Sequence, residues 1–327
     1  MLFLRRRATW WFFLIFAIAF CGASIPQEAL GASNTKKASL AYSYYMMGLL
    51  FDFEGQVEEA LKEYQKAAKL EPDNSEIRLR IGAAYAKLGK IPEAIEEFKL
   101  ATQLNPDNLE CHFLLALLYT TERKTDDAVH EYEIVLRKVA ERDPENIQVR
   151  HYLGQLYFQQ KKLDEAIKQF QAILSVDPKD VEALFFLASA YEEKKQHKEA
   201  IATFKKALEI DPKHGNSLNS LGYIYVEQGY DLDEAMVLIK KALEIDPENG
   251  AYIDSLGWAY FKKGMTQEAL VELERAVKLF EDPVIYDHLG DVYLKLGDSD
   301  KAKEQWKRSL ELKEEPSVKA KLERLER

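Results

Sequence analysis

Few residues in this 327-residue chain have the type and spacing that catalysis or metal binding requires. Six histidines occur, but no two stand at metal-ligand spacing and none belongs to an HExxH helix. Cys111, the one cysteine beyond the first 25 residues, falls within an apolar periodic stretch, where a structural thiol is expected rather than a nucleophile. The chain carries no GxSxG elbow, phosphate-binding glycine loop or dinucleotide fingerprint. We therefore predict no catalytic site, no cofactor and no metal.

Composition and charge narrow the class of protein further. Hydrophobic residues make up 47% of the chain and charged residues 31%, which is enough apolar material for a large core and excludes a disordered protein. The formal net charge of -10 predicts that nucleic acid is not a partner, because phosphate would be repelled. Only two cysteines are present, so a disulfide-stapled scaffold is excluded.

Residues 1–25 have the layout of an export signal or an N-terminal membrane anchor. Arg5, Arg6 and Arg7 precede an uncharged, mainly apolar run from residue 8 to residue 25. The arginines should remain in the cytosol, so the chain from about residue 32 onward should lie outside the cytoplasmic membrane. We expect an exported protein that is periplasmic or membrane-anchored, with residues 26–40 as a polar tether.

Three processing routes fit this segment. A signal peptidase could cut after Ala23 or after Gly31, since small residues stand at the required positions. Cys21 followed by glycine resembles the lipidated cysteine of bacterial lipoproteins, although Phe20 departs from the small residue of that pattern. Alternatively, the apolar run is just long enough to span a bilayer and to remain as an anchor. Membrane contact is expected through the segment itself or through the lipid.

The prolines show that the rest of the chain is repetitive. Eight of the ten prolines follow one another at spacings of 34, 38, 34, 34, 35, 36 and 33 residues, which is typical of a repeat architecture. Proline is expected to end a helix because its ring clashes with the preceding turn. The internal landmarks divide the chain into eight units with the bounds 41–74, 75–108, 109–146, 147–180, 181–214, 215–249, 250–282 and 283–316.

Each unit contains two amphipathic stretches with the same landmarks. A glycine or alanine occupies the eighth position, an aromatic residue the eleventh, and an alanine lies near the start of the second stretch. Small residues allow two helices to pack closely, and the aromatic residues fill the space beside that contact. The units therefore predict pairs of antiparallel helices, with no strands.

This landmark set resembles the tetratricopeptide repeat (TPR) family over residues 41–316. The resemblance implies an all-α, right-handed solenoid of eight helix-turn-helix units with a concave groove. Residues 317–327 have Val318, Leu322 and Leu325 at helical spacing, so we expect a capping helix over the last unit.

The resemblance also implies which residues line the groove, since the family uses positions 2, 5, 9, 12 and 13 of each first helix. The residues that we predict to bind the partner are Tyr45, Leu49, Phe53, Phe113, Leu117, His151, Gln155, Phe158, Phe185, Ser189, Asn219, Tyr223, Val226, Trp258 and Phe261, with the acidic residues Glu192, Glu193, Glu227, Asp254, Asp287 and Asp291 at the C-terminal end. Position 5 never carries lysine, so this is not the carboxylate-clamp version of the family. The alternative is that these aromatic residues form the core between repeats.

The function that these features predict is protein binding without catalysis. We expect a scaffold or adaptor of the bacterial cell envelope whose partner is a helix or an extended segment with apolar and basic residues. Such a scaffold could assemble a secretion, polysaccharide or outer-membrane complex, or deliver substrates to an envelope protease. A chaperone-like holder of unfolded exported proteins is the alternative, and an envelope enzyme is a third. Neither the identity of the partner nor the oligomeric state follows from the sequence.

Overall fold

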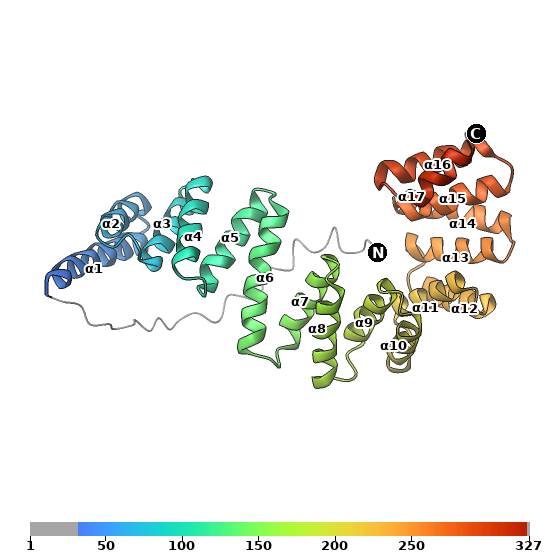
Figure 1. The fold of residues 1–327 in the computed structure, drawn as a ribbon, viewed down its shortest axis with the longest axis horizontal. Helices are drawn as coiled ribbons and strands as arrows, with labels where there is room; N and C mark the ends of the chain where they lie inside the picture. The colour runs from blue at the N-terminus through green and yellow to red at the C-terminus, as the bar shows by residue number, and fades with distance from the viewer. Residues whose placement is uncertain (1–31, 326–327) are drawn as a thin grey trace. The chain divides into compact units, whose positions relative to one another are not determined.

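The structure is a computed structural model that describes residues 32–325, and in this range all of its regular structure is α-helical (Figure 1). The helices are α1 (Ala32–Phe53), α2 (Val57–Leu70), α3 (Ser75–Lys87), α4 (Ile91–Leu104), α5 (Leu109–Thr121), α6 (Thr125–Arg142), α7 (Ile147–Gln159), α8 (Leu163–Val176), α9 (Val181–Glu193), α10 (His197–Ile210), α11 (Gly215–Gln228), α12 (Leu232–Ile245), α13 (Gly250–Lys262), α14 (Thr266–Leu279), α15 (Pro283–Lys295), α16 (Ser299–Leu312) and α17 (Pro316–Leu325). The predicted all-α fold is confirmed.

The helices follow one another in pairs, one pair for each predicted unit. We call the odd-numbered helices from α1 to α15 the first helices, and their even-numbered partners the second helices. Except for α1, every first helix begins at the first residue of a predicted unit, and α17 follows the eighth pair. The helix-turn-helix units and the C-terminal helix predicted from the repeats are therefore present.

Two features differ from the prediction. Helix α1 begins at Ala32, so residues 32–40 belong to a helix and not to the tether that we expected through residue 40. Pro283 and Pro316 are the first residues of α15 and α17, whereas we expected them to end helices. Proline is well tolerated at the first position of a helix, because its missing N–H would have no partner there.

The chain divides into two compact units, and the division falls within α7. The N-terminal unit extends to Leu156 and the C-terminal unit begins at Tyr157. Residues 1–31 lie outside the described part of the chain, and so do the predicted export signal and Cys21. Within residues 32–325, no helix has the length and apolar character needed to cross a membrane.

The two helices of a pair approach each other closely at the predicted small residues. A Cβ atom built on Gly48 would lie 2.5 Å from the ring of Tyr64, and one on Gly290 would lie 2.4 Å from Nε1 of Trp306. Because real Cβ contacts are not this short, these positions accept only glycine without a shift of the neighbouring ring. The pattern of small and aromatic residues thus fixes how each first helix rests on its second helix.

Candidate protein-binding surface

The first helices of the C-terminal unit meet at Trp258, on α13. Its ring stacks on His288 of α15, with 3.9 Å between ring centroids, and on Phe261, with 5.0 Å. Nε1 of Trp258 donates a hydrogen bond of 2.5 Å to Oε1 of Glu227 on α11. Only 7% of the residue is exposed. The prediction that Trp258 is accessible to a partner is therefore wrong, because its ring already fills the space between neighbouring first helices.

Asp254, another predicted partner-binding residue, also has a partner within the chain. Its Oδ1 lies 2.9 Å from Nδ1 of His288, and both residues are buried. Burial lowers the pKa of His288, but the charge and the hydrogen bond of Asp254 more than offset this, so the pKa is raised above its ordinary value. Asp254 and His288 form an internal ion pair when the histidine is protonated.

The acidic residues at the C-terminal end of the predicted surface have partners from the chain itself. Lys321 of α17 places its Nζ 2.7 Å from Asp287 and 2.8 Å from Asp291. Burial raises the pKa of Asp291 and outweighs the opposing effect of Lys321. Glu192 lies 2.8 Å from Nδ1 of His197. A basic partner segment would have to compete with these contacts, so the predicted acidic attraction is weaker than the sequence suggested.

Four aromatic residues of the C-terminal unit remain partly exposed on this surface: Phe158, Phe185, Tyr223 and Phe261. Phe185 packs edge-on against Phe186 at 5.2 Å and against His214 at 5.5 Å. Burial, followed by the charge of Glu227, raises the pKa of the Tyr223 hydroxyl. These side chains are held in place by their neighbours and still present part of their surface to solvent.

The remaining predicted residues of the C-terminal unit vary in exposure. Val226 is buried, with 1% exposed, so the prediction that it lines the surface is wrong. Phe158 is half-buried and contacts Phe186 edge-on at 6.2 Å. Ser189, Asn219 and Glu193 are half-buried, and Glu227 is exposed.

In the N-terminal unit most of the predicted residues are half-buried, namely Tyr45, Leu49, Phe113, Leu117, His151 and Gln155. The Tyr45 hydroxyl donates to Oε1 of Glu76 at 3.2 Å, and burial followed by the charge of Glu76 raises its pKa. Phe53, at the end of α1, differs sharply because 90% of it is exposed. Tyr42 lies on the same helix, 56% exposed. The most accessible aromatic side chains of the candidate surface are thus at the start of the repeats.

Sequence reasoning missed several residues of this surface. Tyr42 occupies position 2 of the first unit, so the family positions alone would have identified it. Lys321 follows Asp287 by 34 residues, and His288 follows Asp254 by the same interval. About one repeat length separates facing residues on successive odd-numbered helices, so a search for opposite charges at this interval would have found both pairs.

No group of three or more histidine, cysteine, aspartate or glutamate side chains within residues 32–325 could hold a metal ion. Cys111 is buried, and burial raises the pKa of its thiol to about 12, so it is protonated at neutral pH.

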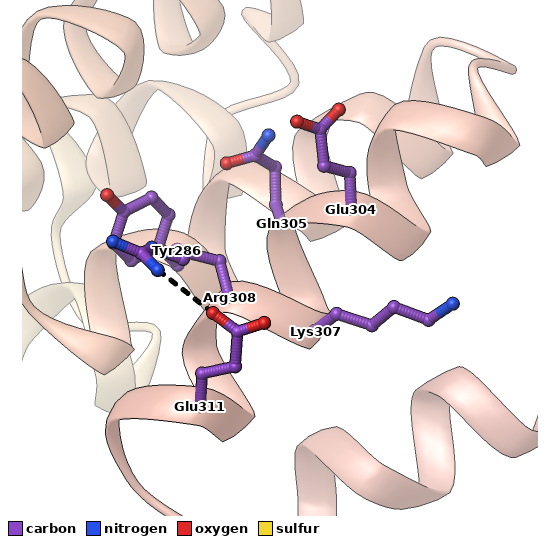
Figure 2. Close-up of a pocket in the computed structure, with 6 residues that line it drawn as sticks. All are labelled: Tyr286, Glu304, Gln305, Lys307, Arg308 and Glu311. Atoms are coloured by element: carbon purple, nitrogen blue, oxygen red, sulfur yellow. Dashed lines mark hydrogen bonds and ion pairs between the residues drawn. The ribbon is translucent and has the colours of Figure 1, made fainter.

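A shallow depression on the surface of α15 and α16 is lined by polar and charged side chains (Figure 2). Figure 2 shows the guanidinium of Arg308 directed at Glu311, and a second carboxylate, that of Glu281, lies 2.9 Å from it. The guanidinium drawn near Tyr286 is therefore already neutralised by carboxylates of the chain itself.

Paired helices that repeat at a near-constant interval, with aromatic residues along the first helices, define a helical-repeat protein of the protein-binding class. The sequence matches models of the tetratricopeptide repeat at residues 54–89, 84–121, 113–175, 153–215, 203–236, 252–283 and 284–316. These matches cover well over half of the chain, which belongs to the tetratricopeptide repeat family. No curated protein matches the chain.

A solved structure agrees on the fold. This tetratricopeptide repeat protein from Parabacteroides merdae ATCC 43184 is 18% identical, with a TM-score of 0.58 over 77% of this chain and 98% of its own. Two further matches have lower scores. A thermophilic TPR protein of Thermus thermophilus is 22% identical, with a TM-score of 0.49 over 55% of this chain and 98% of its own. MamA from Desulfovibrio magneticus RS-1 is 19% identical, with a TM-score of 0.43 over 51% of this chain and 94% of its own.

Proposed function

We propose that this protein is a non-enzymatic scaffold of the bacterial cell envelope that binds another protein through the first helices of its repeats. The observation that carries the proposal is the exposure of aromatic side chains on these helices, above all Phe53 at 90% and Tyr42 at 56%. Exposed apolar patches mark interaction sites, and large aromatic groups are enriched among the residues that dominate binding energy.

The internal contacts of the acidic residues sharpen the chemistry of the partner. Asp287 and Asp291 already pair with Lys321, and Asp254 pairs with His288. Apolar contacts should therefore contribute more to the affinity of a partner segment than basic side chains do. We propose a helix or an extended segment whose apolar side chains contact the exposed aromatic side chains of α1, Tyr42 and Phe53. Basic residues in that segment would contribute to orientation rather than to most of the affinity.

The envelope location is proposed from the sequence of residues 1–25. The arginines and the apolar run support export, and Cys21 offers one means of attachment. The variant Cys21→Ala tests this point by membrane fractionation: release of the protein from the membrane supports lipidation, whereas unchanged membrane association favours a retained apolar anchor.

The binding proposal is tested by crosslinking in the native envelope. A photo-reactive amino acid replaces Phe53 in one strain and Val271 in another. Val271 serves as the matched control because it is 63% exposed but lies on α14, a second helix. A single saturable product at position 53 that is absent at position 271 supports a scaffold. Many weak products at position 53 favour a chaperone-like holder, and equal labelling at both positions contradicts the proposal.

A further inference from the structure

One stripe of exposed side chains runs along α1 from Lys36 and ends at Glu54, directly after the helix. It consists of Lys36, Leu40, Ser43, Met47, Leu50 and Glu54, which are separated by four, three, four, three and four residues. This alternation keeps side chains on one face of a helix and is the spacing of a coiled-coil seam. Leu40 is 47% exposed, Met47 42% and Leu50 47%, and the other three members are also exposed.

The same repeat positions are buried one unit later. Ile81 and Ala84 follow Met47 and Leu50 by 34 residues, and each is only 2% exposed. They pack in a cluster with Leu61, Tyr64 and other residues of α2, the second helix of the preceding unit. This face of a first helix is therefore shaped to receive another helix, yet no described residue covers it on α1.

The charges at the two ends of the stripe indicate what covers it. Lys36 lies near the start of α1 and Glu54 directly follows its end, and the stripe between them is uncharged. In an antiparallel pair of α1 helices, a two-fold axis that places Leu40 opposite Leu50 also places Lys36 opposite Glu54. The small side chain of Ser43 then faces Met47. A parallel pair would place like charges together and align the two helix dipoles unfavourably.

We propose that α1 pairs with α1 of a second copy of the chain, forming an antiparallel dimer with two-fold symmetry. The contact is isologous, so the same stripe serves both copies and the assembly closes at two. Tyr42 and Phe53 are not members of the heptad stripe, although Phe53 flanks it between Leu50 and Glu54. The proposal goes beyond scaffold function and does not depend on it.

The mass of the purified full chain in mild detergent, measured by light scattering after gel filtration, tests the dimer. We expect the wild type to be a dimer and Leu50→Glu to be a monomer, because the two-fold axis would bury two carboxylates without partners. The dissociation constant should rise at least about a hundredfold. Val271→Glu changes an equally accessible apolar residue on α14 and should remain a dimer. Unchanged helicity by circular dichroism shows that Leu50→Glu folds.

Two further variants test the register. Lys36→Glu and Glu54→Lys should each weaken the dimer, and the double variant should restore it. When variants with a single new cysteine at Leu40 or at Leu50 are mixed and oxidised, a disulfide should join position 40 of one copy to position 50 of the other. Neither variant should link to itself, since residues ten apart on a helix are separated by about 15 Å along its axis.

Clear results would overturn the proposal. The proposal is overturned if the wild-type chain stays monomeric up to about 100 μM, because a functional dimer should form well below that concentration. A Leu50→Glu variant that remains a dimer also overturns the proposal. If that variant keeps the wild-type mass and instead loses binding to lipid vesicles, the stripe is assigned to a bilayer surface. Self-linking at position 40 would establish a parallel pair and contradict the antiparallel arrangement.

Discussion

The two ends of the repeat array are completed in different ways. At the C-terminal end, α17 buries Val318 against the last unit, and its Lys321 pairs with Asp287 and Asp291. At the N-terminal end, α1 exposes six large apolar side chains, Leu40, Tyr42, Met46, Met47, Leu50 and Phe53. Terminal repeats need a polar outer face to stay soluble alone, and within residues 32–325 the C-terminal end has one whereas α1 does not. The open end is therefore where contacts with other molecules should concentrate.

The difference shows that the role of a residue in a repeat depends on its neighbours more than on its own type. Phe53 and Trp258 were both predicted to line the groove from first helices, yet one is 90% exposed and the other 7%. Phe53 lies at the end of α1, whereas Trp258 lies between α11 and α15 and contacts residues of both. The same pattern yields an accessible ring at an edge and a packed ring between repeats.

The largest expected effect is the difference in the free energy of unfolding between alanine variants of these two residues. Trp258→Ala should lower the free energy of unfolding by about 3–5 kcal/mol, because it removes a buried ring and leaves a cavity. Phe53→Ala should change it by less than about 0.5 kcal/mol. Urea unfolding followed by circular dichroism measures both. A loss at Phe53 as large as that at Trp258 would show that the ring is covered in solution, and the contrast between the two ends would fail.

A smaller effect is expected from the closing contact of α17. Lys321→Met should cost about 1–3 kcal/mol, because it leaves Asp287 and Asp291 close together without their cation. Adding Asp287→Asn and Asp291→Asn to this variant should recover part of the loss. The matched control at the open end is Lys36→Met, with an expected change of less than about 0.5 kcal/mol in a monomeric background. If Lys321→Met is neutral, α17 does not depend on this contact.

Most of the fold could be predicted because the same pattern of small and aromatic residues occurs in eight successive units. Gly48 and Gly290 stand at equivalent positions, and in both cases a large ring of the second helix occupies the space of a side chain. What the pattern could not supply was the start of α1 at Ala32, since residues 32–40 contain too few apolar residues for a clear helical period. Pro283 was misjudged because a proline can end one helix or begin the next.

The candidate surface was predicted less well, for a physical reason. Family positions say which side of a first helix a residue occupies, but the exposure of that side depends on the size of the neighbouring side chains. Val226 is buried, and Asp254 is buried against His288, so neither side chain is accessible on the predicted surface. Charge pairing between adjacent repeats was also overlooked, and it changes the chemistry expected of the partner.

The smallest effect that we predict concerns pH and involves one buried histidine in each unit. In the C-terminal unit, burial opposes the charge of His288, but Asp254, with Asp287 and Glu227 farther away, raises its pKa. In the N-terminal unit, a hydrogen bond of 2.6 Å to Glu131 raises the pKa of His112 against the effect of burial. Each histidine thus binds its proton more tightly in the folded chain than in the unfolded chain.

The sign of the pH dependence follows from these raised pKa values. The stabilisation from each pair is complete below about pH 6.5, the ordinary pKa of histidine, and is lost as the pH rises through the raised pKa of the folded state. Unfolding free energies measured from pH 6 to pH 9 should therefore fall less for His288→Gln than for the wild type, and His112→Gln should behave in the same way. Because the two pairs lie in different units, the double variant should show the sum of the two changes. A single variant that abolishes the whole pH dependence would show that only one of the pairs titrates in this range.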